Sequence, residues 1–174
     1  ITMTITIRHL VSALLVLSFG LLGSLIPGGS IETRSFSHID PLILGAFNTF
    51  LTSLEIVSLL IIYFIFKDLK WAFIVSSLCA MSYFIVYALD LGTLFPVSPD
   101  PMPQALFVIE VLGMIVSLPL LFLSVRGAMT SNTSGKEQVI ESKPYSKTFV
   151  YFAFFLVIVG VGIITFATKS AIGS

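Results

Sequence analysis

The chain has 174 residues, of which 56% are hydrophobic and only 10% are charged, and its mean hydropathy is +1.06. Soluble domains carry about 25% charged residues, so this composition excludes an ordinary water-soluble fold. Nine acidic and nine basic residues give a formal net charge of zero, so nothing indicates nucleic acid or another polyanion as a partner. The single cysteine, Cys79, excludes a disulfide framework and a CxxC redox or zinc pair.

Five apolar stretches follow one another along the chain, and each approaches or exceeds the roughly 20 residues with which a helix crosses a bilayer. Backbone groups in lipid must be satisfied within the segment, which favours helices. The sequence therefore predicts an all-α integral membrane protein, a single transmembrane domain of about five helices in contact with the lipid bilayer. The predicted spans are 10–26, 42–66, 72–94, 104–125 and 148–167.

The first stretch has a second interpretation. Arg8 precedes the apolar run, and small residues at Gly28 and Gly29 follow it, which is also typical of a signal peptide. We expect a retained span, and cleavage would leave four spans with the same sidedness.

The distribution of lysine and arginine predicts the orientation. With five spans, seven basic residues fall on one side of the membrane and two on the other. Cytoplasmic loops carry an excess of basic residues, so we expect the N-terminus in the cytoplasm and the C-terminus outside. This describes a multi-pass protein of the cytoplasmic membrane, which we expect to be prokaryotic. The seven are Arg8, Lys67, Lys70, Arg126, Lys136, Lys143 and Lys147, and the two are Arg34 and Lys169.

The connecting segments differ in character. The predicted outer loops are 27–41 and 95–103, the second of which contains four prolines and is expected to be stiff. The predicted cytoplasmic loop 127–147 is rich in Ser, Thr, Lys and Glu and has no apolar face, so we expect it to be mobile.

Three carboxylic acids lie inside the predicted spans, namely Glu55, Asp90 and Glu110. Ionisable groups in a bilayer are costly and usually face a bundle interior or a water-filled cavity. Each one belongs to a polar stripe at helical spacing. The stripes are Gly45, Asn48, Thr52 and Glu55; Ser76, Ala80, Tyr83, Tyr87 and Asp90; and Glu110, Ser117 and Ser124.

If the three stripes converge, they enclose an acidic cavity that opens outward, with Glu55 as its floor and the outer loops as its lid. The ligand-binding candidates are Glu55, Glu110, Asp90, Asn48, Thr52, Tyr83 and Tyr87. Nearby carboxylates in a low dielectric repel each other and favour a bound cation or proton. The alternative interpretation is a polar clamp that holds the helices together.

The first outer loop supplies a second group of candidates: Glu32, Arg34, His38 and Asp40. His38 and Asp40 form a His-x-Asp pair, but two ligands are too few for a metal site, and we expect a solvated loop. We expect neither a metal nor another cofactor. Glycines at 160 and 162, and Gly20 with Ser24, predict close helix packing.

Three functions stay open. The first is binding or transport of a small cationic or proton-coupled solute through the acidic cavity, by a homo-oligomer. The second is an accessory or structural subunit that packs against a larger membrane partner. The third is an intramembrane enzyme acting on a lipid or isoprenoid, which a lateral opening between helices would favour; we expect that the protein is not an enzyme. No HExxH, GxSxG or nucleotide-binding motif occurs.

Overall fold

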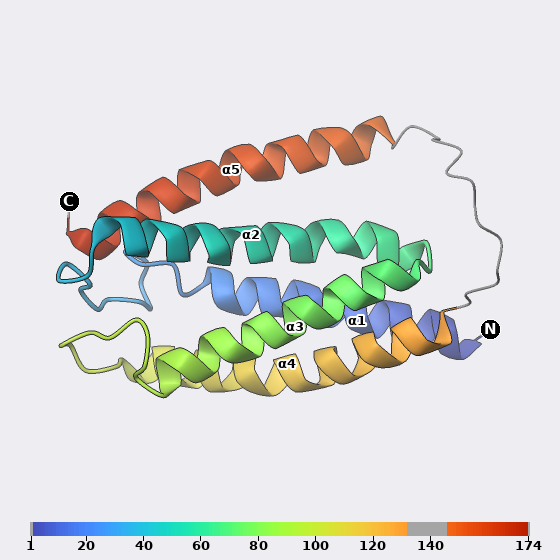
Figure 1. The fold of residues 1–174 in the computed structure, drawn as a ribbon, viewed down its shortest axis with the longest axis horizontal. Helices are drawn as coiled ribbons and strands as arrows, with labels where there is room; N and C mark the ends of the chain where they lie inside the picture. The colour runs from blue at the N-terminus through green and yellow to red at the C-terminus, as the bar shows by residue number, and fades with distance from the viewer. Residues whose placement is uncertain (1, 132–145, 174) are drawn as a thin grey trace.

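Five helices make up the part of the chain that the structure describes. The structure is a computed structural model, and it describes residues 2–131 and 146–173, with side chains from residue 7 onward. The helices lie side by side along one long axis, with the N-terminus at one end of the bundle and the C-terminus at the other (Figure 1). They are α1 (Thr2–Gly23), α2 (Pro41–Phe66), α3 (Lys70–Leu91), α4 (Gln104–Thr130) and α5 (Lys147–Ile172).

The predicted fold class is confirmed: the described residues form an all-helical structure, and four of its helices are long and apolar enough to cross a membrane. These four are α2 to α5, of 22 to 27 residues each. The apolar part of α1 is shorter and runs from Ile7 to Gly23. Large apolar side chains on the outside of the bundle, which water would disfavour, are suited to contact with lipid.

Several predicted boundaries were wrong by a few residues. α1 ends at Gly23 and α3 at Leu91, three residues before the predicted ends, because turns begin there rather than at the following prolines. α4 passes through Pro119 and continues to Thr130, so residues 127–130 are helical rather than part of the cytoplasmic loop. α5 continues to Ile172, where Gly173 ends it in a left-handed conformation. Residues 132–145 of that predicted loop lie outside the described residues.

Helices α1 to α4 form a closed ring in which α1 packs against α2 and α4, and α3 packs against the same two helices. Its interior is apolar: Val11, Leu15, Phe73 and Leu120 are fully buried. Gly127 permits a close approach in this core, because a Cβ atom there would collide with the ring of Phe73. The ring is therefore densely packed at the end of the bundle that holds the N-terminus.

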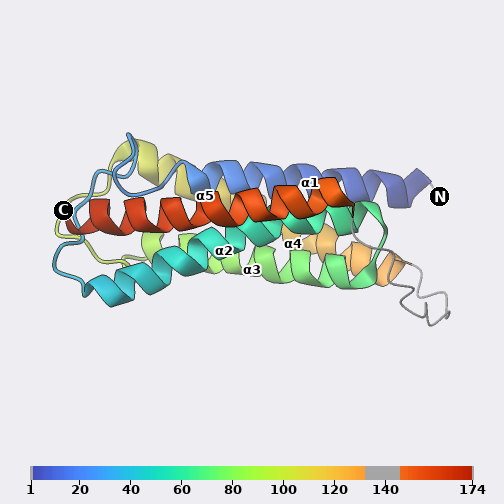
Figure 2. The same ribbon diagram turned by 90° about the horizontal axis from the view of Figure 1, so that it is seen from above.

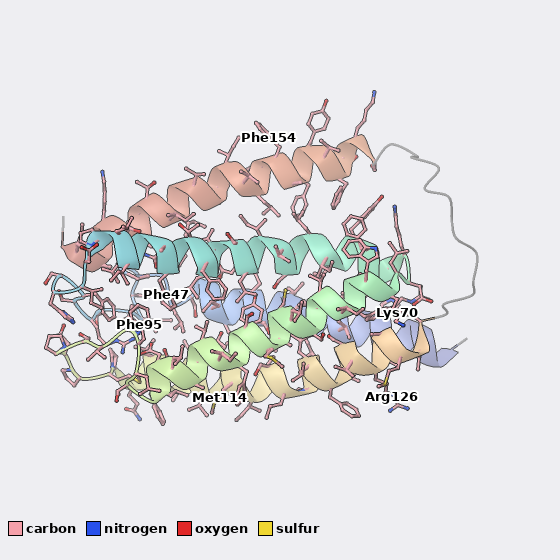
Figure 3. The ribbon with its side chains drawn as sticks, in the orientation of Figure 1. Phe47, Lys70, Phe95, Met114, Arg126 and Phe154 are labelled. Atoms are coloured by element: carbon pink, nitrogen blue, oxygen red, sulfur yellow. The ribbon has the colours of Figure 1, made fainter. Side chains whose placement is uncertain are left out.

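Helix α5 is the outlying element. Among the described helices it contacts α2 only, and it lies over α2 and α1 when the bundle is seen from above (Figure 2). Tyr63 of α2 stacks on Phe149 at one end of this contact, with 4.4 Å between ring centroids, and Asn48 bonds Thr168 at the other. Phe154 points away from the bundle (Figure 3). α5 thus has one protein-facing side and a wide apolar side.

The basic residues gather at the end of the bundle that holds the N-terminus. Lys70 and Arg126 mark this end (Figure 3). Arg8 donates to the carbonyl oxygen of Phe66 there, at 3.2 Å, and Lys67 lies over the ring of Tyr63. The opposite end, which we call the C-terminal end, holds the segments between α1 and α2 and between α3 and α4.

Candidate functional site

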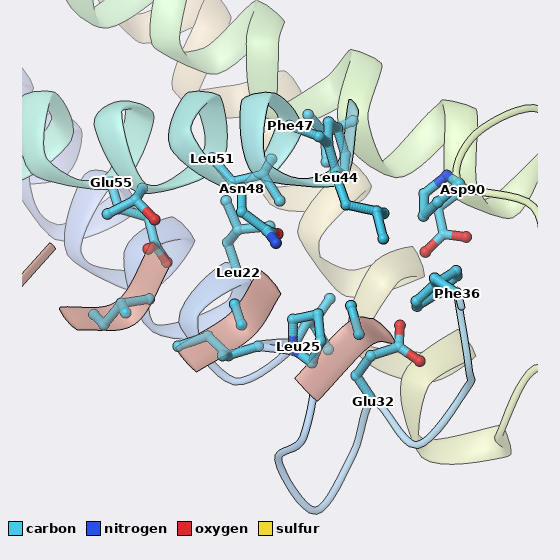
Figure 4. Close-up of a pocket in the computed structure, with 18 of the residues that line it drawn as sticks. Leu22, Leu25, Glu32, Phe36, Leu44, Phe47, Asn48, Leu51, Glu55 and Asp90 are labelled. Carbon is cyan, nitrogen blue, oxygen red and sulfur yellow. The ribbon is translucent and has the colours of Figure 1, made fainter. Parts of the chain in front are cut away.

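A cavity of about 70 Å³ lies in the C-terminal half of the bundle. Its walls come from all five helices and from both connecting segments at that end. Glu55 lies at one end of the cavity and Asp90 with Glu32 at the other, with Asn48 and Leu22 between them (Figure 4). The volume is enough for water or a small ligand. The apolar lining includes Leu22, Leu25, Leu44, Phe47, Leu51, Val86 and Ile163.

The three intramembrane carboxylic acids meet at this cavity. Glu55 reaches it from α2, Asp90 from α3 and Glu110 from α4, and their exposed fractions are 5%, 8% and 2%. The three predicted stripes face the bundle interior, because every side chain of the α3 stripe is buried and so are Ser117 and Ser124 of α4. Glu55, Asp90 and Glu110 therefore line one cavity, which is the arrangement that the sequence left as a condition.

Arg34 forms the strongest polar contact of the site. Its guanidinium donates to both carboxylate oxygens of Asp90, at 2.9 and 2.7 Å. It also donates to both oxygens of Glu32, at 2.9 and 2.6 Å, and all three side chains are buried. Burial disfavours the charged guanidinium, but the hydrogen bonds and charges of Glu32 and Asp90 outweigh it and raise the pKa of Arg34. One cation therefore holds two carboxylates at the edge of the cavity.

Glu110 lines the same cavity as Asp90 and Glu32, and only 2% of it is exposed. In the described part of the chain it forms no ion pair with Arg34. Glu110 is therefore a further carboxyl group at the cavity beyond the two that Arg34 holds.

Three buried side chains at the cavity keep a polar atom without a hydrogen-bond partner in the described part of the chain: Glu55 Oε1, Glu110 Oε2 and Tyr87 Oη. An unpaired buried polar atom costs about 1–3 kcal/mol, more for a charged group. Three such atoms around one hollow space indicate a place where water or a ligand supplies the missing bonds.

The other ligand-binding candidates divide into two groups. Asn48 and Thr52 line the cavity with Glu55, as their common stripe predicts, and the amide of Asn48 also donates to Thr168 Oγ1 at 3.1 Å. Tyr83 does not line the cavity. Its hydroxyl donates to Ser58 Oγ at 2.9 Å, so Tyr83 joins α3 to α2 below the site.

The outer-loop candidates also separate. Glu32 lines the cavity, and Arg34 forms an ion pair with Glu32 without lining the cavity itself. His38 and Asp40 are exposed. Asp40 caps α2 by accepting a hydrogen bond from the backbone N–H of Leu42 at 2.7 Å, with Pro41 in the first turn. Across residues 2–131 and 146–173, no three potential metal ligands come together.

The segments between α1 and α2 and between α3 and α4 cover the C-terminal end of the cavity. The backbone N–H of Ser35 donates to Asp100 at 2.8 Å, and Ser98 Oγ donates to the carbonyl oxygen of Ser35 at 2.9 Å. Phe95 packs edge-on against Phe47, and Pro96 reaches the cavity wall. The proline-rich segment is therefore tied to the first loop and to α2.

The predicted glycine contacts are correct at one position and wrong at two. Gly160 packs closely on α2, where a Cβ atom would lie 2.7 Å from Ile56 and 3.1 Å from Thr52. Gly20 and Gly162 have no neighbour within 4 Å. Their side of the helix is open because α1 and α5 do not pack against each other within the described residues.

Sequence reasoning gave no role to two residues that shape the site. Arg34 was one of four loop candidates, and nothing in its local pattern indicates a partner 56 residues away. Gly113 of α4 is not among the predicted site residues, yet a Cβ atom there would collide with the ring of Tyr87. A glycine on one predicted helix and a tyrosine on a neighbouring inward-facing stripe are the sequence signal for such a contact.

Comparison with known proteins gives one finding. A family described as "Domain of unknown function (DUF8051)" matches residues 7–139, which include the cavity walls contributed by α1 to α4 but not those from α5. No curated protein and no solved structure matches the chain.

Proposed function

Because the chain belongs to the DUF8051 family of domains of unknown function, we propose its activity from the site alone: it binds a small cation, an amine in the first instance, in the acidic cavity. The observation that carries this proposal is the set of three buried polar atoms without partners, on Glu55, Tyr87 and Glu110, around one cavity. An ammonium group has three donors and no acceptor, which suits a site built from carboxylates and a hydroxyl oxygen.

The charge distribution also supports a cation. Four carboxyl groups line the cavity, and Arg34 forms ion pairs with two of them, Glu32 and Asp90. In the part of the chain that the structure describes, no ion pair reaches Glu55 or Glu110. Two further carboxyl groups in a low dielectric favour a bound cation or a proton.

We further propose that binding is coupled to proton release. A cation competes with protons for the carboxylates, because Glu55 and Glu110 have no ion-pair partner in the described chain and carboxyl groups in a low dielectric favour either a bound cation or a proton. The apparent affinity for an amine should therefore rise as the pH is raised from acidic to neutral. Such competition is the basis of proton-coupled transport of a small solute, which is the activity we favour.

The orientation is part of the proposal. In the described chain Arg8, Lys67, Lys70, Arg126 and Lys147 lie at the N-terminal end of the bundle, and Arg34 and Lys169 at the C-terminal end. By the excess of basic residues in cytoplasmic segments, we place the N-terminus in the cytoplasm, α1 as a fifth span and the cavity in the outer half of the cytoplasmic membrane.

The test is thermal unfolding of the purified protein in detergent with ethylammonium chloride, against sodium chloride at the same ionic strength. Wild type should be stabilised, since a ligand that binds only the folded state raises its stability. Glu55→Gln should fold and lose this response. The matched control is Asp68→Asn, because Asp68 Oδ1 is also buried without a partner but lies at the other end of α2.

The expected result is a shift in wild type and Asp68→Asn and none in Glu55→Gln, with a larger shift at neutral than at acidic pH. An equal shift in all three proteins would remove Glu55 from the site. No shift in wild type would contradict amine binding.

A further inference from the structure

A crevice of about 580 Å³ lies between α5 and residues 23–31, which are the last residue of α1 and the segment that follows it. Both helices pack on α2, and within the described residues they do not pack on each other. The walls are apolar side chains and glycines, which leave the space wide. They include Gly23, Ile26 and Gly28 on one side, and Gly162, Ile163 and Phe166 on the other.

This crevice adjoins the acidic cavity. Ile26 and Ile163 line both spaces. Gly23 lines the crevice, and a Cβ atom at Gly23 would lie only 3.1 Å from Glu55 Oε1. That oxygen has no hydrogen-bond partner in the described chain, and only 5% of Glu55 is exposed. Gly23, which has no side chain, therefore lies between the crevice and the unpaired oxygen of Glu55.

The C-terminal end of this arrangement is closed. Gly28, with a φ of +86°, lies so near α5 that a Cβ atom there would be 2.5 Å from Ser170 Oγ. The backbone N–H of Phe36 donates to the carbonyl oxygen of Ala171 at 3.0 Å, which ties the first loop to the end of α5. The buried cluster of Glu32, Arg34 and Asp90 lies under the same loops. The loops close this end over the cluster, and the crevice opens between the first loop and the exposed apolar side of α5, which includes Val159 and Phe166.

We propose that the ligand is a single-chain amphiphile with an ammonium head group, which reaches Glu55 from the bilayer through the crevice between residues 23–31 and α5. The inference rests on the proposed function and names its ligand class and route. The head group lies in the acidic cavity and bonds Glu55, and the alkyl chain lies between the glycines and isoleucines of the crevice. The cationic head group matches the acidic cavity, and the apolar tail matches the crevice that adjoins it.

The test compares dodecylammonium with ethylammonium in thermal unfolding of the protein in zwitterionic lipid nanodiscs. Gly162→Leu fills the crevice, and we expect it to fold because a Cβ atom at this position would meet no atom within 4 Å outside its own stretch of helix. Gly20→Leu is the matched control: it is also an exposed helical glycine without a neighbour within 4 Å, but it does not line the crevice. Glu55→Gln completes the set.

In Gly162→Leu, dodecylammonium should bind about tenfold more weakly or worse, because a filled crevice must be forced open, while ethylammonium binding stays unchanged. Gly20→Leu should bind both amines as wild type does, and Glu55→Gln should bind neither. If Gly162→Leu binds dodecylammonium as well as wild type does, or if Gly20→Leu weakens it equally, the crevice route is wrong and amine binding stands. If wild type binds neither amine, the proposed function fails, and this inference fails with it.

Discussion

The two halves of the bundle use buried polar residues in different ways. In the N-terminal half, Ser76 and Ser124 bond each other at 2.8 Å, and near the middle Tyr83 bonds Ser58, so these groups join neighbouring helices. In the C-terminal half, Glu55, Tyr87 and Glu110 keep polar atoms without partners and surround a cavity. Both sets lie on inward-facing stripes of the same helices. Ser12 and Asp68 in the N-terminal half also keep such an atom within the described chain, but they do not line that cavity.

The difference shows that burial alone does not separate a structural polar residue from a candidate binding residue. Paired groups across two helices stabilise the packing, by about 0.6 kcal/mol on average in membrane proteins. Unpaired groups around a hollow cost stability and are kept for another reason. The contrast can be tested by substitutions whose effects should differ between the halves.

The largest effect is expected at Arg34. Arg34→Met leaves Glu32 and Asp90 buried without their cation, and removing one partner of a buried ion pair costs about 3–5 kcal/mol. We expect a loss of this size in the free energy of unfolding, measured by denaturation in mixed detergent micelles.

The control for Arg34 is the combined variant Glu32→Gln, Arg34→Met and Asp90→Asn, which removes the charges together. It should recover much of the lost stability, because no buried charge is left unpaired. An Arg34→Met protein as stable as wild type would show that the cluster does not hold the loops.

A smaller effect on stability is expected when alanine replaces Gly127, which packs against Phe73, or Gly162, which faces open space. Gly127→Ala places a Cβ atom against Phe73 and should cost about 1–3 kcal/mol through overpacking. Gly162→Ala, in open space, should be neutral or gain up to about 1 kcal/mol from helix propensity. Thermal unfolding of the two variants in one detergent checks this, and equal effects would contradict the packing difference.

The smallest loss of stability is expected at two tyrosines one turn apart on α3. Tyr83→Phe removes a hydroxyl that bonds Ser58 and should cost about 1 kcal/mol. Tyr87→Phe removes a buried hydroxyl without a partner in the described chain and should leave stability unchanged or raise it, by up to about 1–3 kcal/mol. Because both rings are buried, the lost volume is the same. If both variants lose the same stability, the hydroxyl of Tyr87 is bonded after all.

The sequence was sufficient for the helices and for the direction in which their polar residues face. Long apolar runs specify helices because a chain in lipid has to satisfy its own backbone groups. The 3.6-residue period puts Asn48, Thr52 and Glu55 on one face, and that face is turned inward because charged groups avoid lipid. The same reasoning orients Asp90 and Glu110.

Only the tertiary structure decided which of these faces meet and what they contact. Helical periodicity fixes a face but not its neighbour, so Tyr83 and Tyr87 belong to one stripe and yet only Tyr87 reaches the cavity. The partner of Asp90 is Arg34, brought by a loop from 56 residues away, a contact that no local pattern encodes. The open side of Gly162 likewise depends on where α5 lies relative to α1, because a glycine permits close packing but does not supply the helix that packs against it.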